Sequence, residues 1–373
     1  MATWRIPPVW ASAWSASSWR CSRRTASSPS CGRRMCAASC GLDRTDPVSS
    51  VSVLPRLDPT TYGRHRLHTE GCVWVEKNCY VDIWIEVIHA LGLEPRAVLP
   101  FTAAIDFEGD QWTFFKPPHD ELRELYGIDV QEMNVWRPLI EHALEHLGAG
   151  RLISTEADAF WLPDTSGTDY RRQHTKSTIV LNDLDLEKRR LGYFHNAGYY
   201  SLEGEDFART FRLDTPPDPT FMPLFAELVR IDALVRRPAS ELLALSRSLW
   251  RRHLKRRPAS NPVRRFQARF ERDLPGIQER GLAYYHAWAF GTIRQLGAAF
   301  ELAAANLEWL TAGGVAGLAP ATLAFEQLSA ANKTLILKGA RATNSRRPLD
   351  GAALFEEMAG AWERGMQAME PLL

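Results

Sequence analysis

Apolar residues recur at helical spacing directly after Asn78. They lie three or four positions apart: Val81, Ile85, Ile88 and Leu91. This spacing is typical of an amphipathic helix with one buried side. Asn78 is a favourable N-cap, and Gly92 is a favourable signal for the end of a helix. The pattern therefore predicts a helix over residues 79–91, with Cys79 in its first turn.

The segment that follows mixes alternating runs with short amphipathic ones. The alternation predicts strands over residues 97–107, 111–115, 130–135, 151–157, 175–181 and 191–200. Short helices are expected over 119–126 and 138–147. The polar run Asn182–Asp185 is expected to begin the exposed connection between the last two strands. Together these elements predict an α+β domain with an antiparallel sheet.

The pattern changes after the proline-rich segment at 214–219. Strand signals disappear, and helices are expected over residues 221–235, 240–254, 262–272, 278–310, 320–338 and 349–369. The expected helix over 278–310 carries Tyr284, Tyr285, Trp288 and Phe290 among alanines, which is more typical of a bundle core than of a cofactor site. We therefore expect an α+β domain over 56–215 and an all-α domain over 216–373.

Residues 1–55 show neither the periodicity of a helix nor that of a strand, and they are rich in Ser, Arg, Ala and Cys. This composition predicts a disordered segment or a start codon assigned too early. A zinc-binding arm at Cys31, Cys36 and Cys40 is the alternative, although no C-x2-C pair is present. All six cysteines lie in the first 79 residues, a distribution that favours a reducing compartment or a separate origin for this segment over a disulfide framework.

Length and charge exclude several classes of protein. A chain of 373 residues is long enough for two domains. A net charge of +1 argues against general nucleic-acid binding, because phosphate-binding surfaces carry a basic excess. No apolar run is long enough for a membrane span, and no secretory signal pattern is visible. A cytoplasmic protein without nucleic-acid or membrane partners is expected.

The cysteine at the start of the predicted helix is the candidate nucleophile. Free N–H groups and the helix dipole stabilise a thiolate there and can hold an oxyanion. The alternative interpretation is that Cys79 is a small buried apolar residue, as free cysteines often are. Cys72 lies in an extended stretch without a helix start, and we expect it to be structural.

His174, at the head of a predicted strand, is the candidate base. Asn196 on the following strand could orient its imidazole, which gives the Cys–His–Asn order of papain-like enzymes. His195 is the alternative base, and Asp158 would then orient it. Asp158 could also bind an amine or support His174, whereas Asp164 is expected to cap a turn. His174 could equally be a surface residue of a polar run.

Two charged regions have both a functional and a structural interpretation. Acidic residues cluster around 106–110 without calcium-loop spacing, so a hairpin turn is expected and no metal site. A basic stretch could form a docking patch for an acidic carrier protein or, more simply, a solvated helix face. Its residues are Arg251, Arg252, Lys255, Arg256 and Arg257.

Four segments carry a resemblance to the DUF1839 family. They are Glu76–Trp84 (EKNCYVDIW), Asp106–Phe115 (DFEGDQWTFF), Asp158–Thr165 (DAFWLPDT) and Tyr193–Tyr199 (YFHNAGY). The chain more distantly resembles the papain-like acyltransferase domain at the N-terminus of the butirosin biosynthesis protein H. Cys79, the segment 158–163 and His174 match the order of that domain, whereas Asn196 matches less well. The resemblance implies transfer from a carrier-protein thioester.

The expected fold is therefore a papain-like cysteine-nucleophile domain followed by helices. The expected activity is an acyltransferase that moves an acyl or aminoacyl group from a carrier protein through Cys79 to an amine acceptor, without a cofactor. A cysteine hydrolase (thioesterase, amidase or peptidase-like) would share every catalytic residue. A non-catalytic carrier-protein-binding protein is the third interpretation.

Overall fold

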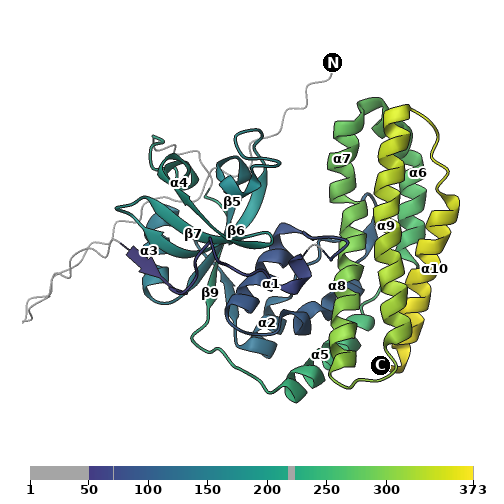
Figure 1. Cartoon of the computed structure of the whole chain (residues 1–373), viewed down its shortest axis with the longest axis horizontal. Helices are drawn as coiled ribbons and strands as arrows, with labels where there is room; N and C mark the ends of the chain where they lie inside the picture. The colour runs from purple at the N-terminus through teal and green to yellow at the C-terminus, as the bar shows by residue number, and fades with distance from the viewer. Residues whose placement is uncertain (1–49, 70, 217–222, 373) are drawn as a thin grey trace, which may run out of the picture. The chain divides into compact units, whose positions relative to one another are not determined.

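A computed structural model of the chain describes residues 50–69, 71–216 and 223–372. These residues belong to one compact unit, in which a sheet with its covering helices precedes a helical region (Figure 1). The zinc-binding arm considered at Cys31, Cys36 and Cys40 concerns residues outside those described. Among the described residues, no helix combines the length and the hydropathy that a membrane crossing requires.

The main sheet has seven strands, all in antiparallel pairs. Its order is β4-β9-β5-β6-β7-β8, and β1 pairs with the second half of β6. The strands are β1 (Ser50–Ser52), β4 (Asp129–Glu132), β5 (Leu152–Asp158), β6 (Lys176–Asp185), β7 (Arg190–His195), β8 (Gly198–Glu203) and β9 (Ala226–Arg230). A separate hairpin joins β2 (Phe107–Glu108) to β3 (Gln111–Trp112). The expected antiparallel sheet in the first half of the chain is confirmed.

The sheet separates two hydrophobic cores. Because side chains alternate along a strand, Val180 and Phe194 face one side and Ile179 and Tyr193 the other. The first pair packs in the core that contains α1 (Cys79–Ala90), where Asn78 caps the helix as predicted. The second pair packs with α3 (Leu139–Gly148) and α4 (Gly204–Thr210).

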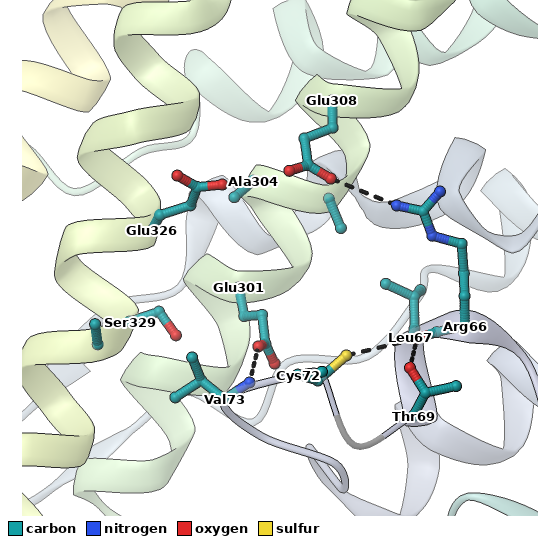
Figure 2. Close-up of a pocket in the computed structure, with 13 residues that line it drawn as sticks. Arg66, Leu67, Thr69, Cys72, Val73, Glu301, Ala304, Glu308, Glu326 and Ser329 are labelled. Atoms are coloured by element: carbon teal, nitrogen blue, oxygen red, sulfur yellow. Dashed lines mark hydrogen bonds and ion pairs between the residues drawn. The ribbon is translucent and has the colours of Figure 1, made fainter.

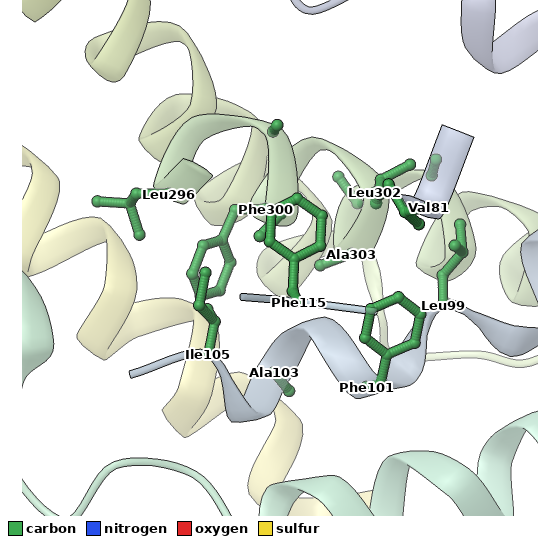
Figure 3. Packing of buried hydrophobic residues seen from close by; sticks show 14 of the residues in the cluster. Val81, Leu99, Phe101, Ala103, Ile105, Phe115, Leu296, Phe300, Leu302 and Ala303 are labelled. Atoms are coloured by element: carbon green, nitrogen blue, oxygen red, sulfur yellow. The ribbon is translucent and has the colours of Figure 1, made fainter. Parts of the chain in front are cut away.

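The helical region extends the core of α1. Its helices are α5 (Ala239–Leu254), α6 (Pro262–Arg280), α7 (Leu282–Gly291), α8 (Ile293–Ala312), α9 (Ala319–Ser345) and α10 (Ala352–Met369), with the 3-10 turn η5 (Glu370–Leu372) at the end. Side chains of the 3-10 helix η2 (Pro95–Ala104) and of α8 pack in one layer (Figure 3). Trp74 lies so close to Gly297 that a Cβ there would be 2.5 Å from its indole ring. The helices therefore hold the segment that leads into α1.

Four expectations about these elements are wrong. Residues 97–107 form η2 rather than a strand, because an apolar run buried on all sides has no period to read. In the expected helix over 221–235, residues 226–230 form β9 between β4 and β5, so the sheet continues past the proline-rich segment. Ser50–Ser52, expected to be disordered, pairs with β6. The expected helix over 278–310 is interrupted at Gly281 and Thr292.

The last expected strand pair also differs in its register. The exposed connection expected at 182–185 is part of β6, and the Asn182 side chain is fully buried, donating to Tyr199 Oη at 2.9 Å. The expected strand 191–200 is a hairpin of β7 and β8, with Asn196 and Ala197 in its turn.

The remaining elements are η1 (Arg66–His68), α2 (His119–Tyr126), η3 (Ala159–Trp161) and η4 (Pro163–Thr165).

Candidate active site around Cys79

Cys79 is the first residue of α1 and is half-buried. Asn78 Oδ1 accepts hydrogen bonds from the amides of Tyr80 at 3.1 Å and Val81 at 2.9 Å. The same side chain donates through Nδ2 to Phe115 O at 3.0 Å, which fixes the cap. Within the described residues the amide of Cys79 itself has no acceptor, so one N–H group of the helix end stays free beside the thiol.

The sulfur lies beside a hydroxyl group, and a guanidinium contributes to the electrostatics around it. Cys79 Sγ is 3.9 Å from Thr178 Oγ1 on β6. Arg294, at the start of α8, donates through Nε and Nη2 to Glu76 O at 3.1 and 2.6 Å. Burial lowers the pKa of Arg294, and the nearby Asp82, Glu76 and Cys79 oppose that shift. Arg294 therefore contributes positive charge near the thiol, a role that its position more than 200 residues away in the sequence concealed.

His174 is paired with Asp158 but has no contact with the thiol. Its Nδ1 lies 2.6 Å from Asp158 Oδ2, and its ring stacks on Phe160 with a centroid distance of 4.4 Å. The His174 side chain is 70% exposed. Four residues of extended chain, about 13 Å, separate it from Thr178. Among the described residues, no hydrogen bond joins Cys79 to a histidine.

Asn196 does not orient His174 in this structure. It occupies the two-residue turn between β7 and β8 with φ +43°, a left-handed conformation that asparagine tolerates. The expectation placed Asn196 on a continuous strand, and the hairpin breaks that strand at this residue. Asp158 holds the imidazole instead, which is the supporting role that was the alternative for this carboxylate.

His195, the alternative base, belongs to the opposite face of the sheet. Its Nδ1 lies 2.6 Å from Asp164 Oδ2, and its Nε2 lies 2.6 Å from Ser177 Oγ. Tyr193 Oη donates to the other oxygen of Asp164 at 2.5 Å. Ser177 is 7% exposed and His195 1%, so this Ser–His–Asp arrangement is closed. His195 is therefore a satisfied core histidine, and Asp164 supports it rather than only capping a turn.

A third histidine cluster lies beside the residue that follows Cys79. Tyr80 Oη is 2.7 Å from His119 Nε2 and donates to Glu227 at 2.9 Å. Ser154 Oγ donates to the same carboxylate at 3.0 Å. Burial lowers the pKa of His119, while the charge of Glu227 acts in the opposite direction. This cluster could not be predicted from the sequence, because Glu227 lies in a segment expected to be helical.

A buried polar network joins His68 to two carboxylates of α1. His68 Nε2 is 3.0 Å from Asp82 Oδ1, and His68 Nδ1 is hydrogen-bonded to Glu86. Both carboxylates are fully buried. Burial acts to lower the pKa of His68, but the hydrogen bonds to the two carboxylates outweigh it and raise the pKa. Asp82 also accepts from the amide of Lys77 at 2.8 Å, which ties the network to the segment before Cys79.

The basic stretch after residue 250 is partly neutralised by ion pairs. Arg252 lies 2.9 Å from Glu124, and Arg257 lies 2.9 Å from Glu370. Further along, Arg264 and Arg269 pair with Glu356 and Asp273. The stretch therefore presents less free positive charge than its sequence suggests.

A cavity of about 500 Å³ lies between the segment before Cys79 and helices α8 and α9. Figure 2 shows the side chains that line it. Cys72 lines it, with Sγ 3.5 Å from Arg66 O. Arg66 forms an ion pair with Glu308 at 3.6 Å. Burial and the neighbouring Glu308 raise the pKa of Glu326. In the described part of the chain, no group of three or more potential ligand side chains is arranged to hold a metal ion.

Comparison with known families assigns both halves of the chain. The model of the DUF1839 N-terminal domain matches residues 63–231, and the model of the DUF1839 C-terminal domain matches residues 239–371. No curated protein matches the chain. The two matches leave few residues of the described chain uncovered, and the chain belongs to the DUF1839 family.

Proposed function

We propose that this protein is an acyltransferase that carries an acyl or aminoacyl group on Cys79 and passes it to an amine. The observation that carries the proposal is the position of Cys79 as first residue of α1, half-buried and beside its own free amide. The thiolate would attack a thioester carbonyl, and the Cys79 amide would hold the oxyanion. The carbon–sulfur bond of the donor then breaks, and the donor leaves as a thiolate, so that one thiolate replaces another.

In the second half of the reaction, an amine attacks the acyl-Cys79 thioester. Its nitrogen forms the amide bond, the Cys79 sulfur leaves, and a base takes the proton from nitrogen. We assign this base to His174, because Asp158 holds Nδ1 and leaves Nε2 open to solvent. The attacking nitrogen bonds to the carbon that Cys79 Sγ carries, so His174 acts as this base only when it comes closer to Cys79 than it lies in this structure.

We propose an amine rather than water as the acceptor, because a neutral amine is the stronger nucleophile toward a thioester and depends less on a base. The donor that we propose is a carrier-protein thioester, on the resemblance to the butirosin-type domain alone. A thiol nucleophile has to stay reduced, so we place the protein in the cytoplasm.

Incubation with an acyl thioester, followed by intact-protein and peptide mass spectrometry, tests the proposal. The expected result is a mass adduct on Cys79 that disappears when an amine is added and reappears as an amide product. Cys72→Ala is the matched control, since it removes the other described thiol. An adduct that forms equally on Cys79→Ala protein would refute the proposal.

A non-catalytic binding role is the second candidate. It is favoured by the position of Thr178, whose hydroxyl is the hydrogen-bond partner of the sulfur. Among the described residues no histidine takes that place. The two candidates differ in what Cys79→Ala does in cells. If the variant supports the pathway as well as the wild type, binding without catalysis is the function.

A further inference from the structure

A small cavity of about 240 Å³ lies close to the start of α1. Phe101, Ile105 and Phe115 form part of its apolar wall, and Figure 3 shows these three side chains in the layer that packs on α8. Lys116, His253 and Arg256 give the cavity its polar side. The cavity therefore combines an apolar wall with up to three positive groups.

The cations of this cavity differ from the basic residues around them. Arg252 and Arg257 are paired with carboxylates, whereas Lys116 and Arg256 form no ion pair with any described residue. Lys116 Nζ lies over an aromatic ring, 5.2 Å from the centroid of Tyr80. Two uncompensated cations at one cavity attract an anion.

His253 adds a buried group with unused hydrogen-bonding capacity. It is 2% exposed, and its Nε2 lies 2.6 Å from Glu121 Oε1. Its Nδ1 is buried and has no hydrogen-bond partner. Arg252 Nη1 also contacts Glu121 at 3.4 Å, and among the described residues Glu121 forms no ion pair with Lys116 or Arg256.

The cavity adjoins the residues on either side of Cys79. Phe115 O accepts the hydrogen bond from Asn78 Nδ2 at 3.0 Å, and Lys116 lies over the ring of Tyr80. Asn78 precedes Cys79 and Tyr80 follows it. Two lining residues of the cavity, Phe115 and Lys116, thus contact the neighbours of Cys79 in the sequence.

We infer that this cavity binds an oxyanion, a phosphate or a carboxylate, that is attached to an apolar segment. Lys116 and Arg256 bind the oxyanion, and the aromatic wall covers the apolar segment. The assignment of this ligand as the anionic arm of the acyl donor rests on the proposed function. Binding of the anion itself does not.

Ligand-observed NMR on Cys79→Ala protein tests the binding site. Phenyl phosphate and benzoate are compared with benzyl alcohol, which has the same ring without the charge. We expect at least one anion to bind more tightly than the alcohol, and Lys116→Gln and Arg256→Gln each to weaken it about tenfold. Arg257→Gln, with the same change of charge, should leave binding unchanged. The preferred anion decides between phosphate and carboxylate.

Two results overturn the binding site: equal binding of the neutral alcohol, or an equal loss in Arg257→Gln. A second assay tests the assignment to the donor, using thioesters whose thiol arm carries or lacks the preferred anion. Faster acylation of Cys79 by the charged thioester, lost in Lys116→Gln, supports it, and equal rates overturn it. If neither thioester acylates Cys79 while the anion still binds, the proposed function fails and the cavity stands.

Discussion

The two faces of the sheet hold polar groups of opposite character. On the face of α1, Cys79 is half-buried, and the carboxylate–imidazole pair Asp158–His174 is exposed and distant from the sulfur. On the other face, Ser177, His195 and Asp164 are joined by two 2.6 Å contacts and almost fully buried. The more complete triad is thus the less accessible. Hydrogen-bond geometry alone does not identify an active site, because a substrate also has to reach the nucleophile.

The largest effect is expected from removing the thiol. Cys79→Ala should abolish acylation and lower amide formation at least about 1000-fold, because the covalent intermediate cannot form. Product formation is measured by mass spectrometry with an acyl thioester and an amine. Ser177→Ala is the matched control on the other face, and it should retain the wild-type rate. A loss of activity in Ser177→Ala with Cys79→Ala unaffected would reverse the assignment of the two faces.

The next effect concerns the exposed histidine. His174→Gln should slow amine transfer about 100-fold and leave the acylation of Cys79 unchanged, since the base acts on the acceptor. Rapid-quench measurement of the two half-reactions separates them. Asp158→Asn should show the same pattern more weakly, and Asn196→Ala should change neither step. Equal slowing of both steps in His174→Gln would show that His174 acts on the sulfur after all.

A smaller effect is expected at Arg294. Arg294→Met removes positive charge near Cys79 and the two hydrogen bonds to Glu76 O. Alkylation of Cys79 by iodoacetamide at pH 7 should become about tenfold slower, because a thiolate is less favoured without that charge. Arg294→Lys should recover part of the rate if charge is the cause. An unchanged alkylation rate in Arg294→Met would assign this residue a structural role only.

Only some of the residues that distinguish the two faces of the sheet could be predicted from the sequence. The helix start at Cys79 and its Asn78 cap were predictable, because capping and helical periodicity are local signals. Asn196 was assigned to the wrong environment because a two-residue turn inside an apolar run is hard to see in a single sequence. Two contacts are set by tertiary packing between distant segments and could not be predicted. They are the hydrogen bond from Arg294 to Glu76 O and the contact of Asp164 with His195.

The strands and helices show the same division. The expected helices 119–126 and 138–147 are close to α2 and α3, since each has a clear amphipathic period. The expected helix over 221–235 contains β9, whose place between two strands overrides its local preference. The run 97–107 packs against α5 and α8, and its two polar positions, Thr102 and Asp106, are too few to reveal a period.

On the closed face, the triad should matter for stability and not for catalysis. His195→Ala leaves the Asp164 carboxylate and the Ser177 hydroxyl buried without their partner, which should lower the free energy of unfolding by about 3 kcal/mol. The exposed His174→Ala should change it by less than about 0.5 kcal/mol. Urea denaturation of both variants measures the difference. Similar losses in the two variants would contradict the contrast between an open and a closed face.

The smallest effect expected is a pH dependence of stability that arises at His65 and His68, which lie beside α1. Burial lowers the pKa of His65 to about 4, so the unfolded chain binds a proton that the folded chain does not, and stability should fall as the pH drops from about 6.5 toward 4. His68 has the opposite sign. Its raised pKa contributes stability that is fully present below about 6.5 and is lost as the pH rises through the folded value.

His65→Leu should flatten the acid side of a stability profile measured by urea denaturation between pH 4 and 9. The alkaline side should persist, because His68 keeps its bonds to Asp82 and Glu86. An acid side unchanged by His65→Leu would place the responsible groups elsewhere, for example on the closed face. In that case the two faces of the sheet would not differ in how their buried histidines make stability depend on pH.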